Sequence, residues 1–87
     1  DGEVVIEGHT DDTPVRGGTY RSNWELSTAR ATEVLEILVE AHGIPPRRFS
    51  AAGYGEFRPA ASNASDAGRA LNRRIDVVIS ADSGIKP

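Results

Sequence analysis

One helix with a clear start and stop is the feature that most constrains the fold of this chain. Its start is marked by Ser22-Asn23-Trp24-Glu25, which has the Ser-x-x-Glu form of a capping box. Its stop is marked by Gly43, followed by Pro45 and Pro46, which prevent the helix from resuming. Between these signals, apolar residues recur at helical spacing and form a predicted buried stripe of Leu26, Ala29, Val34, Leu35, Leu38 and Ala41. We therefore predict a helix from residue 22 or 23 to residue 42.

Strand patterns lie on both sides of this helix. The β-branched residues at positions 4–6 predict a strand that ends at Gly8, and residues 49–54 predict a second, weaker one. Ser65 or Asp66 is expected to cap a short helix through residue 71. Residues 74–80 alternate as a half-buried strand does, with Ile75, Val77 and Ile79 on one face. This order predicts an α+β fold, a βαβ layer in which helices pack on one face of a small mixed sheet.

Composition excludes several classes of function. The 87-residue chain has a net charge of -3, whereas nucleic-acid binding depends on an excess of Lys and Arg, so no nucleic-acid partner is expected. No apolar run approaches the ~20 residues that a membrane-spanning helix needs. The absence of Cys excludes disulfides, thiolate zinc sites and cysteine nucleophiles. A chain of this length is expected to form one domain with a modest core.

The stretch from Gly8 to Arg30 ends the first strand, crosses a loop rich in Pro and Gly, and enters the helix. Loops this long are often functional. Asp11 lies just past the strand, and Asn23, Ser27 and Arg30 share one face of the helix near its N-terminal end. A carboxylate beside a guanidinium complements a zwitterion, because Asp11 can accept from an ammonium while Arg30 holds a carboxylate through two parallel hydrogen bonds. We therefore predict a site for a ligand with an amino-acid α-centre.

Arg73 and Arg74 begin the last predicted strand, where side-chain alternation sends them to opposite faces. One of them is expected to reach the pocket, and the other to form an ion pair or remain solvated. The residues alone leave a simpler interpretation open, in which Asp11 and Arg30 pair with each other or with the backbone and bind no ligand.

Neither a metal site nor a catalytic centre is expected. His9, Asp11 and Asp12 resemble a metal cluster, but His42 is distant in the predicted fold and no third nitrogen or sulfur ligand is available. The adjacent Asp11 and Asp12 diverge and make a poor acid-base pair for glycoside cleavage. No nucleophile elbow supports Ser-His-Asp catalysis. We expect a binding module that is not an enzyme and has no cofactor.

Seven short motifs in register resemble the OmpA-like peptidoglycan-binding domain family. They are Gly8-His9-Thr10-Asp11, Asn23-x-x-Leu26-Ser27-x-x-Arg30-Ala31, Gly43-Ile44, Gly53-Tyr54-Gly55-Glu56, Pro59, Asn63, and Gly68-Arg69-Ala70-x-Asn72-Arg73-Arg74-Ile75. The match runs from about Val4 to Ile79, nearly the whole chain. Each motif alone is weak, whereas seven at compatible spacing are specific. Within the family, the long loop and the helix start are most similar to those of flagellar motor stator proteins.

The resemblance implies non-catalytic binding of the peptide stem of peptidoglycan. Family members hold the amino and carboxyl groups of diaminopimelate with an Asp and an Arg, which fall here on Asp11 and Arg30. The resemblance adds Asn23, Asn72 and Arg73 as ligand-binding residues. It implies a periplasmic domain that anchors an inner-membrane motor stator of a Gram-negative bacterium to the cell wall. An outer-membrane porin or a lipoprotein is the alternative parent, and homodimer formation stays open.

The resemblance also implies a strand and a helix ahead of residue 4, so we expect an N-terminally incomplete domain at residues 1–80 and a frayed tail at 81–87. A function of another class remains as the alternative. The chain would then be a self-association module, in which Asp11 and Arg30 form a structural ion pair and the sheet edge pairs with a neighbour. An exposed apolar face with no polar pocket would distinguish it.

Overall fold

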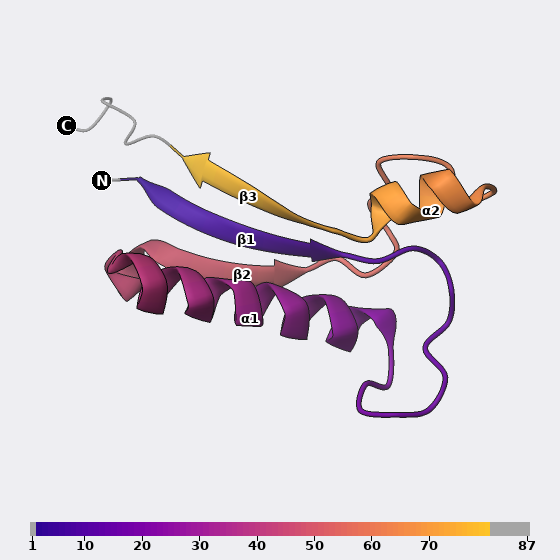
Figure 1. The fold of residues 1–87 in the computed structure, drawn as a ribbon, viewed down its shortest axis with the longest axis horizontal. Helices are drawn as coiled ribbons and strands as arrows, with labels where there is room; N and C mark the ends of the chain where they lie inside the picture. The colour runs from indigo at the N-terminus through magenta and orange to yellow at the C-terminus, as the bar shows by residue number, and fades with distance from the viewer. Residues whose placement is uncertain (1, 81–87) are drawn as a thin grey trace.

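The computed structural model describes residues 2–80, a small mixed sheet with one long helix against one face (Figure 1). The strands are β1 (Glu3–His9), β2 (Phe49–Gly53) and β3 (Arg74–Ser80). The helices are α1 (Asn23–His42), the 3-10 helix η1 (Pro46–Arg48) and α2 (Asp66–Asn72). The predicted α+β element order is confirmed, and the predicted tail at 81–87 lies outside the described residues. No helix within residues 2–80 is long and apolar enough to cross a membrane.

β1 is the central strand of the sheet. It pairs in parallel with β2 and antiparallel with β3, which gives the order β2-β1-β3. The register places Gly8 opposite Gly53 of β2 and Glu7 opposite Asp76 of β3. The carboxyl ends of β1 and β2, the start of β3 and the start of α1 therefore meet at one end of the molecule (Figure 1).

The two ends of α1 follow the local signals in the sequence. The Ser22 hydroxyl accepts a hydrogen bond from the Glu25 backbone N–H at 3.2 Å, and Glu25 accepts from the Arg21 N–H at 3.0 Å. At the other end, Gly43 has φ 64° and donates its N–H to the Val39 carbonyl. A left-handed residue here satisfies a carbonyl that the helix leaves without a partner. The predicted helix bounds are confirmed.

The core lies between α1 and the inner face of β1 and β2. Val4, Ile6 and Ala31 are buried at its centre, and partly buried side chains surround them, namely Val34, Leu35, Leu38, Phe49 and Ile75. The predicted stripe was wrong at its C-terminal end, where Ala41 is exposed. It also left out Asn23, Ser27 and Ala31, which are the buried residues of α1. Small and polar residues face the sheet in the first half of α1, and the apolar stripe takes over in the second half.

The first half of α1 lies unusually close to the sheet. A Cβ atom added to Gly8 would lie 2.1 Å from the Ser27 carbonyl oxygen, and one added to Gly53 would lie 2.1 Å from Thr28 Oγ1. Because Gly8 and Gly53 are paired across β1 and β2, they form a flat area without side chains. The helix backbone rests on this area, which explains why Ser27 is buried there.

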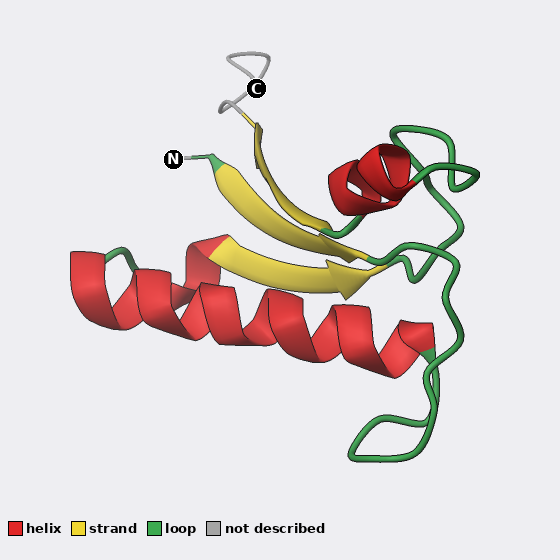
Figure 2. Ribbon diagram, turned by 45° about the vertical axis from the view of Figure 1, so that its right-hand side comes forward, coloured by secondary structure: helices red, strands yellow, loops and turns green. Residues whose placement is uncertain are grey.

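β3 lies at the edge of the sheet, beyond the cover of α1 (Figure 2). The half-buried pattern expected for this strand holds only at its start. Ile75 packs against the core, whereas Val77 is 50% exposed and Ile79 is 68% exposed. The reason is positional, because α1 packs against β1 and β2. The short helix α2 lies beyond the start of β3, so α1 is the helix that covers the sheet face in residues 2–80 (Figure 2).

Candidate functional site

A pocket of about 460 Å³ opens where β1 ends and α1 begins. Its lining comes from the loop after β1, the first two turns of α1 and the residue between α2 and β3: Thr10, Asp11, Thr13, Pro14, Val15, Asn23, Leu26, Arg30 and Arg73. Four of the five predicted site residues are among them. The fifth, Asn72, lies outside the lining.

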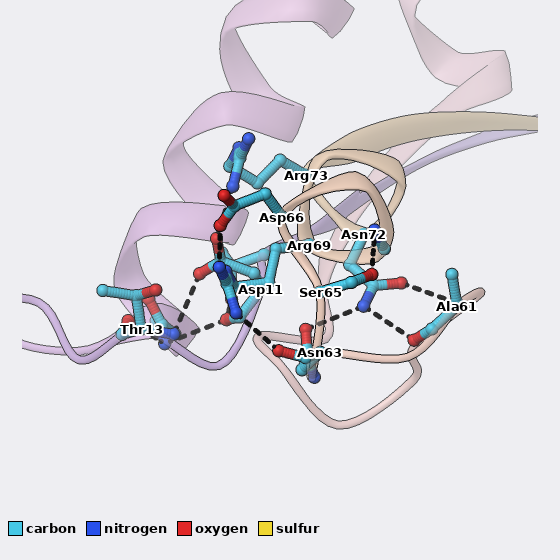
Figure 3. A network of polar contacts seen from close by, with 12 residues as sticks. Asp11, Thr13, Ala61, Asn63, Ser65, Asp66, Arg69, Asn72 and Arg73 are labelled. Carbon is cyan, nitrogen blue, oxygen red and sulfur yellow. Dashed lines mark hydrogen bonds and ion pairs between the residues drawn. The ribbon is translucent and has the colours of Figure 1, made fainter.

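Asp11 provides a buried carboxylate at the floor of the pocket, with only 6% of the residue exposed. Its Oδ1 accepts the Thr13 backbone N–H at 2.9 Å, and its Oδ2 accepts Arg73 Nη1 at 2.6 Å (Figure 3). Burial by itself raises the pKa of Asp11, but the hydrogen bonds from Thr13 and Arg73 outweigh burial and hold the pKa below its ordinary value. Asp11 is therefore ionised at neutral pH, and each oxygen keeps a lone pair for a further donor.

The two arginines of the pocket differ in their contacts. Arg73 reaches across from the start of β3 to pair with Asp11, and its side chain stays 49% exposed. Arg30 lines the pocket from α1, and no carboxylate of residues 2–80 lies within ion-pair distance of its guanidinium. Of the simpler interpretation left open above, the Asp11–Arg30 ion pair is wrong, because Asp11 pairs with Arg73, whereas the pairing of Asp11 with the backbone is present in the hydrogen bond from Thr13. The guanidinium of Arg30 is left facing the pocket.

Asn23 connects the pocket loop to the helix. Its Nδ2 lies 3.1 Å from the Thr13 carbonyl, 3.2 Å from Glu56 Oε1 and 3.5 Å from the Asp11 carbonyl. These contacts join the loop after β1, the helix start and the loop after β2. The buried amide of Asn23 therefore fixes the backbone on which the Asp11 carboxylate is mounted.

Asn72 is fully buried at the end of α2 and holds the loop at residues 60–63 (Figure 3). Its Oδ1 accepts the N–H groups of Ala60 and Ala61 at 2.7 and 2.9 Å, and its Nδ2 donates to the Ala61 carbonyl and Asn63 Oδ1 at 2.9 and 2.8 Å. All four hydrogen-bonding positions of the amide are occupied. The structure thus gives Asn72 a positioning role next to Arg73, and its expected ligand contact stays a prediction.

Replacement of Asn72 by alanine is expected to lower the free energy of unfolding by about 1–3 kcal/mol, because two backbone N–H groups lose their acceptor. Urea unfolding monitored by far-UV circular dichroism measures this loss. Ser62→Ala is the matched control in the same loop, since the Ser62 hydroxyl is exposed and accepts only the Ala64 N–H. An Asn72 variant as stable as the Ser62 variant would contradict the positioning role.

The pocket combines charge with apolar surface. One carboxylate and two guanidinium groups give it an excess of one positive charge, and Pro14, Val15 and Leu26 supply an apolar wall. A zwitterionic group on a hydrocarbon chain fits this combination, with its ammonium at Asp11, its carboxylate at the arginines and its methylene groups against the apolar wall.

Sequence reasoning missed several contributors to the site. Thr13 supplies the backbone N–H that holds Asp11. Glu56, in the loop after β2 and 33 residues beyond Asn23, accepts a hydrogen bond from the Asn23 amide. Glu56 belongs to the Gly53-Tyr54-Gly55-Glu56 motif, which was the available signal. Ser27 was placed on the pocket face, but it is buried under the sheet, where its Oγ accepts the Gly55 N–H at 3.0 Å.

Comparison with known proteins agrees with this architecture. The chain is 43% identical to motility protein B of Bacillus subtilis over 76 residues, which are 87% of this chain and 29% of that protein. It is 40% identical to peptidoglycan-binding protein ArfA of Mycobacterium tuberculosis over 91% of this chain and 23% of that protein. The periplasmic domain of Helicobacter pylori MotB superposes with a TM-score of 0.86 at 32% identity, covering 97% of this chain and 53% of that one.

The chain thus spans 29% and 23% of the length of these two curated relatives. Its residues 1–73 match the OmpA family, which is most of the sequence and includes both the helix and the pocket. The sequence motifs, the mixed sheet and the structural likeness to MotB all agree with that match. This chain belongs to the OmpA family.

Proposed function

We propose that this chain binds the peptide stem of peptidoglycan at the pocket formed by Asp11, Arg30 and Arg73. The observation that carries the proposal is a buried, ionised carboxylate beside two guanidinium groups, one of which has no ion-pair partner within residues 2–80. The relative ArfA is named as a peptidoglycan-binding protein, which supports the same class of ligand. The role is binding, and no catalytic step is assigned to the chain.

Diaminopimelate is the part of the stem that suits the pocket. Its side chain ends in a second amino-acid centre, which carries an ammonium and a carboxylate. Asp11 accepts from the ammonium, and Arg30 holds the carboxylate through paired hydrogen bonds. Arg73 pairs with the Asp11 carboxylate at 2.6 Å and keeps it oriented. Asn23, which also lines the pocket, and Asn72 position the loops that carry these residues.

The proposed biological role is to anchor a membrane protein to the cell wall from the periplasm. Similarity to motility protein B and to the periplasmic domain of MotB supports a flagellar motor stator as the parent. The alternative role as a self-association module loses its main support, because Asp11 pairs with Arg73 and a polar pocket is present.

A titration with two stem peptides tests this proposal. One peptide carries diaminopimelate at its third position, and the other carries lysine, which keeps the ammonium but lacks the terminal carboxylate. Backbone amide shifts are expected to saturate with the first peptide and to cluster at Asp11, Arg30 and Arg73. The lysine peptide is expected to bind about 30-fold more weakly or worse, since a buried charged contact is worth roughly 2–5 kcal/mol.

Equal affinity for the two peptides would show that the pocket does not recognise the zwitterion. Shifts that cluster away from the pocket would place the ligand elsewhere. Either result would refute the assignment of Asp11 and Arg30 as the diaminopimelate clamp.

A further inference from the structure

A second cluster of polar side chains lies on the face of the sheet that α1 leaves uncovered. The register pairs Glu7 of β1 directly with Asp76 of β3, and His9 follows Glu7 on the same face of β1. His9 Nε2 lies 3.4 Å from Asp76 Oδ2 and 3.9 Å from Glu7 Oε1. One donor atom from each of the three residues lies within 4.8 Å of the others.

The imidazole of His9 is the unusual member of this cluster. Its side chain is only 3% exposed, and neither ring nitrogen has a hydrogen-bond partner in the described part of the chain. Tyr54 stacks against the ring at a centroid distance of 5.4 Å. Leaving a buried polar nitrogen without a partner is costly, so such groups call for an explanation. Here Nε2 points towards two carboxylates.

The geometry of His9 suits metal ligation. Its Nε2 faces the Asp76 and Glu7 carboxylates from a buried position, and an imidazole nitrogen with a free lone pair is the histidine group that ligates metals. Burial and Arg74 lower the pKa of His9 more than Asp76 and Glu7 raise it, which favours this neutral form.

A cation between Glu7 and Asp76 would also reduce the repulsion between their carboxylates. Like charges directly opposite each other on neighbouring strands are destabilising. Arg74 Nε relieves only one side of the pair, since it lies 3.2 and 3.1 Å from the two oxygens of Asp76. It holds the Asp76 carboxylate in place while lone pairs remain on both oxygens.

We propose that Glu7, His9 and Asp76 form a site for a divalent transition-metal ion of the zinc class, separate from the stem-peptide pocket. One imidazole nitrogen and two carboxylate oxygens suit zinc and its neighbours better than Mg²⁺ or Ca²⁺, which prefer oxygen alone. A tetrahedral zinc ion holds its donor atoms about 3.3 Å apart. His9 Nε2 lies 3.4 Å from Asp76 Oδ2 and 3.9 Å from Glu7 Oε1, and the side chains of Asp76 and Glu7 are 42% and 22% exposed. Small shifts of these two carboxylates bring the donor atoms to the zinc spacing.

The position of this site gives the ion a structural role. It joins β1 to β3 close to Asp11, which follows the end of β1, and to Arg73, which precedes the start of β3. The sequence pointed to His9, Asp11 and Asp12, a combination that lacked enough ligands. In the structure, the strand register places Glu7 and Asp76, and not Asp11 and Asp12, beside His9. Because Asp76 is 67 positions from His9 in the sequence, the sequence alone did not indicate this contact.

The test is a titration of the full chain, prepared without a histidine tag, with zinc chloride alone. One equivalent of Zn²⁺ is expected to shift the His9 ring nitrogens in long-range ¹H–¹⁵N spectra and to raise the melting temperature, whereas Mg²⁺ does neither. Glu7→Gln and Asp76→Asn are each expected to weaken zinc binding at least tenfold. Glu3→Gln is the matched control, because Glu3 lies on the same strand and the same face, opposite Ser80.

A second control removes the other histidine, since the exposed His42 at the end of α1 offers a surface site. His42→Gln is expected to leave the His9 shifts and the zinc affinity unchanged. Without metal, Glu7→Gln is expected to raise the melting temperature, because it removes the repulsion with Asp76. Zinc binding that survives both carboxylate substitutions, or that disappears with His42, would overturn the proposal, and so would a parent chain that ignores zinc.

Discussion

Replacement of Arg30 by alanine is expected to weaken stem-peptide binding by about 30-fold or more while leaving the free energy of unfolding unchanged. The binding loss follows from removing one partner of a charged contact, which costs roughly 2–5 kcal/mol. The unchanged stability follows from the structure, in which Arg30 is exposed and no carboxylate of residues 2–80 lies within ion-pair distance of it. Alanine is also at least as good a helix former as arginine. Calorimetric titration and urea unfolding measure the two quantities on the same sample.

Two further variants make this prediction specific. Arg30→Lys is expected to restore little affinity, because an ammonium cannot reproduce the paired hydrogen bonds of a guanidinium. Arg47→Ala is the matched control, since Arg47 is exposed in η1, at the other end of α1 from the pocket. Full recovery by lysine would mean that Arg30 contributes only charge. An equal loss in the Arg47 variant would mean that the effect comes from net charge and not from the pocket.

Replacement of Gly8 by alanine is expected to lower the free energy of unfolding by about 3 kcal/mol or more. The new Cβ would lie 2.1 Å from the Ser27 carbonyl oxygen and 2.9 Å from its carbonyl carbon, so backbone atoms would have to move. No change of rotamer relieves an overlap with backbone. The same displacement would shift the first turns of α1, which carry Asn23 and Arg30, so binding is expected to fall as well. Urea unfolding and stem-peptide titration measure these effects.

Gly17→Ala provides the comparison for this prediction. Gly17 has φ 63° in the loop, and no atom lies within 4 Å of the Cβ position. Alanine there carries the backbone strain of a left-handed residue, about 1–2 kcal/mol, without any steric overlap. If Gly8→Ala proved milder than Gly17→Ala, α1 would not rest on the sheet as closely as described.

The elements that were predicted correctly have local causes. The bounds of α1 follow from Ser22, Glu25 and Gly43, each of which acts within one turn of its own position. Asp11 and Arg30 were chosen for charge complementarity, and the pocket contains both. The family motifs added Arg73, whose contact with Asp11 spans 62 residues and leaves no periodic signal in the sequence.

The misjudged residues depend on packing between distant segments. Ala41 fits the helical period but lies beyond the reach of the sheet, whereas Ser27 breaks the apolar pattern and is buried because Gly8 and Gly53 lack side chains. Asn72 was expected in the pocket, but it lies outside the pocket lining and its amide holds the loop at residues 60–63, so its ligand contact stays a prediction. Helical period and residue type alone did not indicate these neighbours.

The edge position of β3 limits how long the site can stay assembled. This strand has a single neighbour in the described sheet, and its outer half is exposed, so it belongs to the class of elements that open locally at less cost than global unfolding. An opening that reached the start of β3 would withdraw Arg73 from Asp11 while β1 stayed paired with β2. The dwell time of a ligand at the proposed site would then depend on the opening of one strand, and a ligand that bridges Asp11 and Arg73 would slow amide exchange along β3 in return.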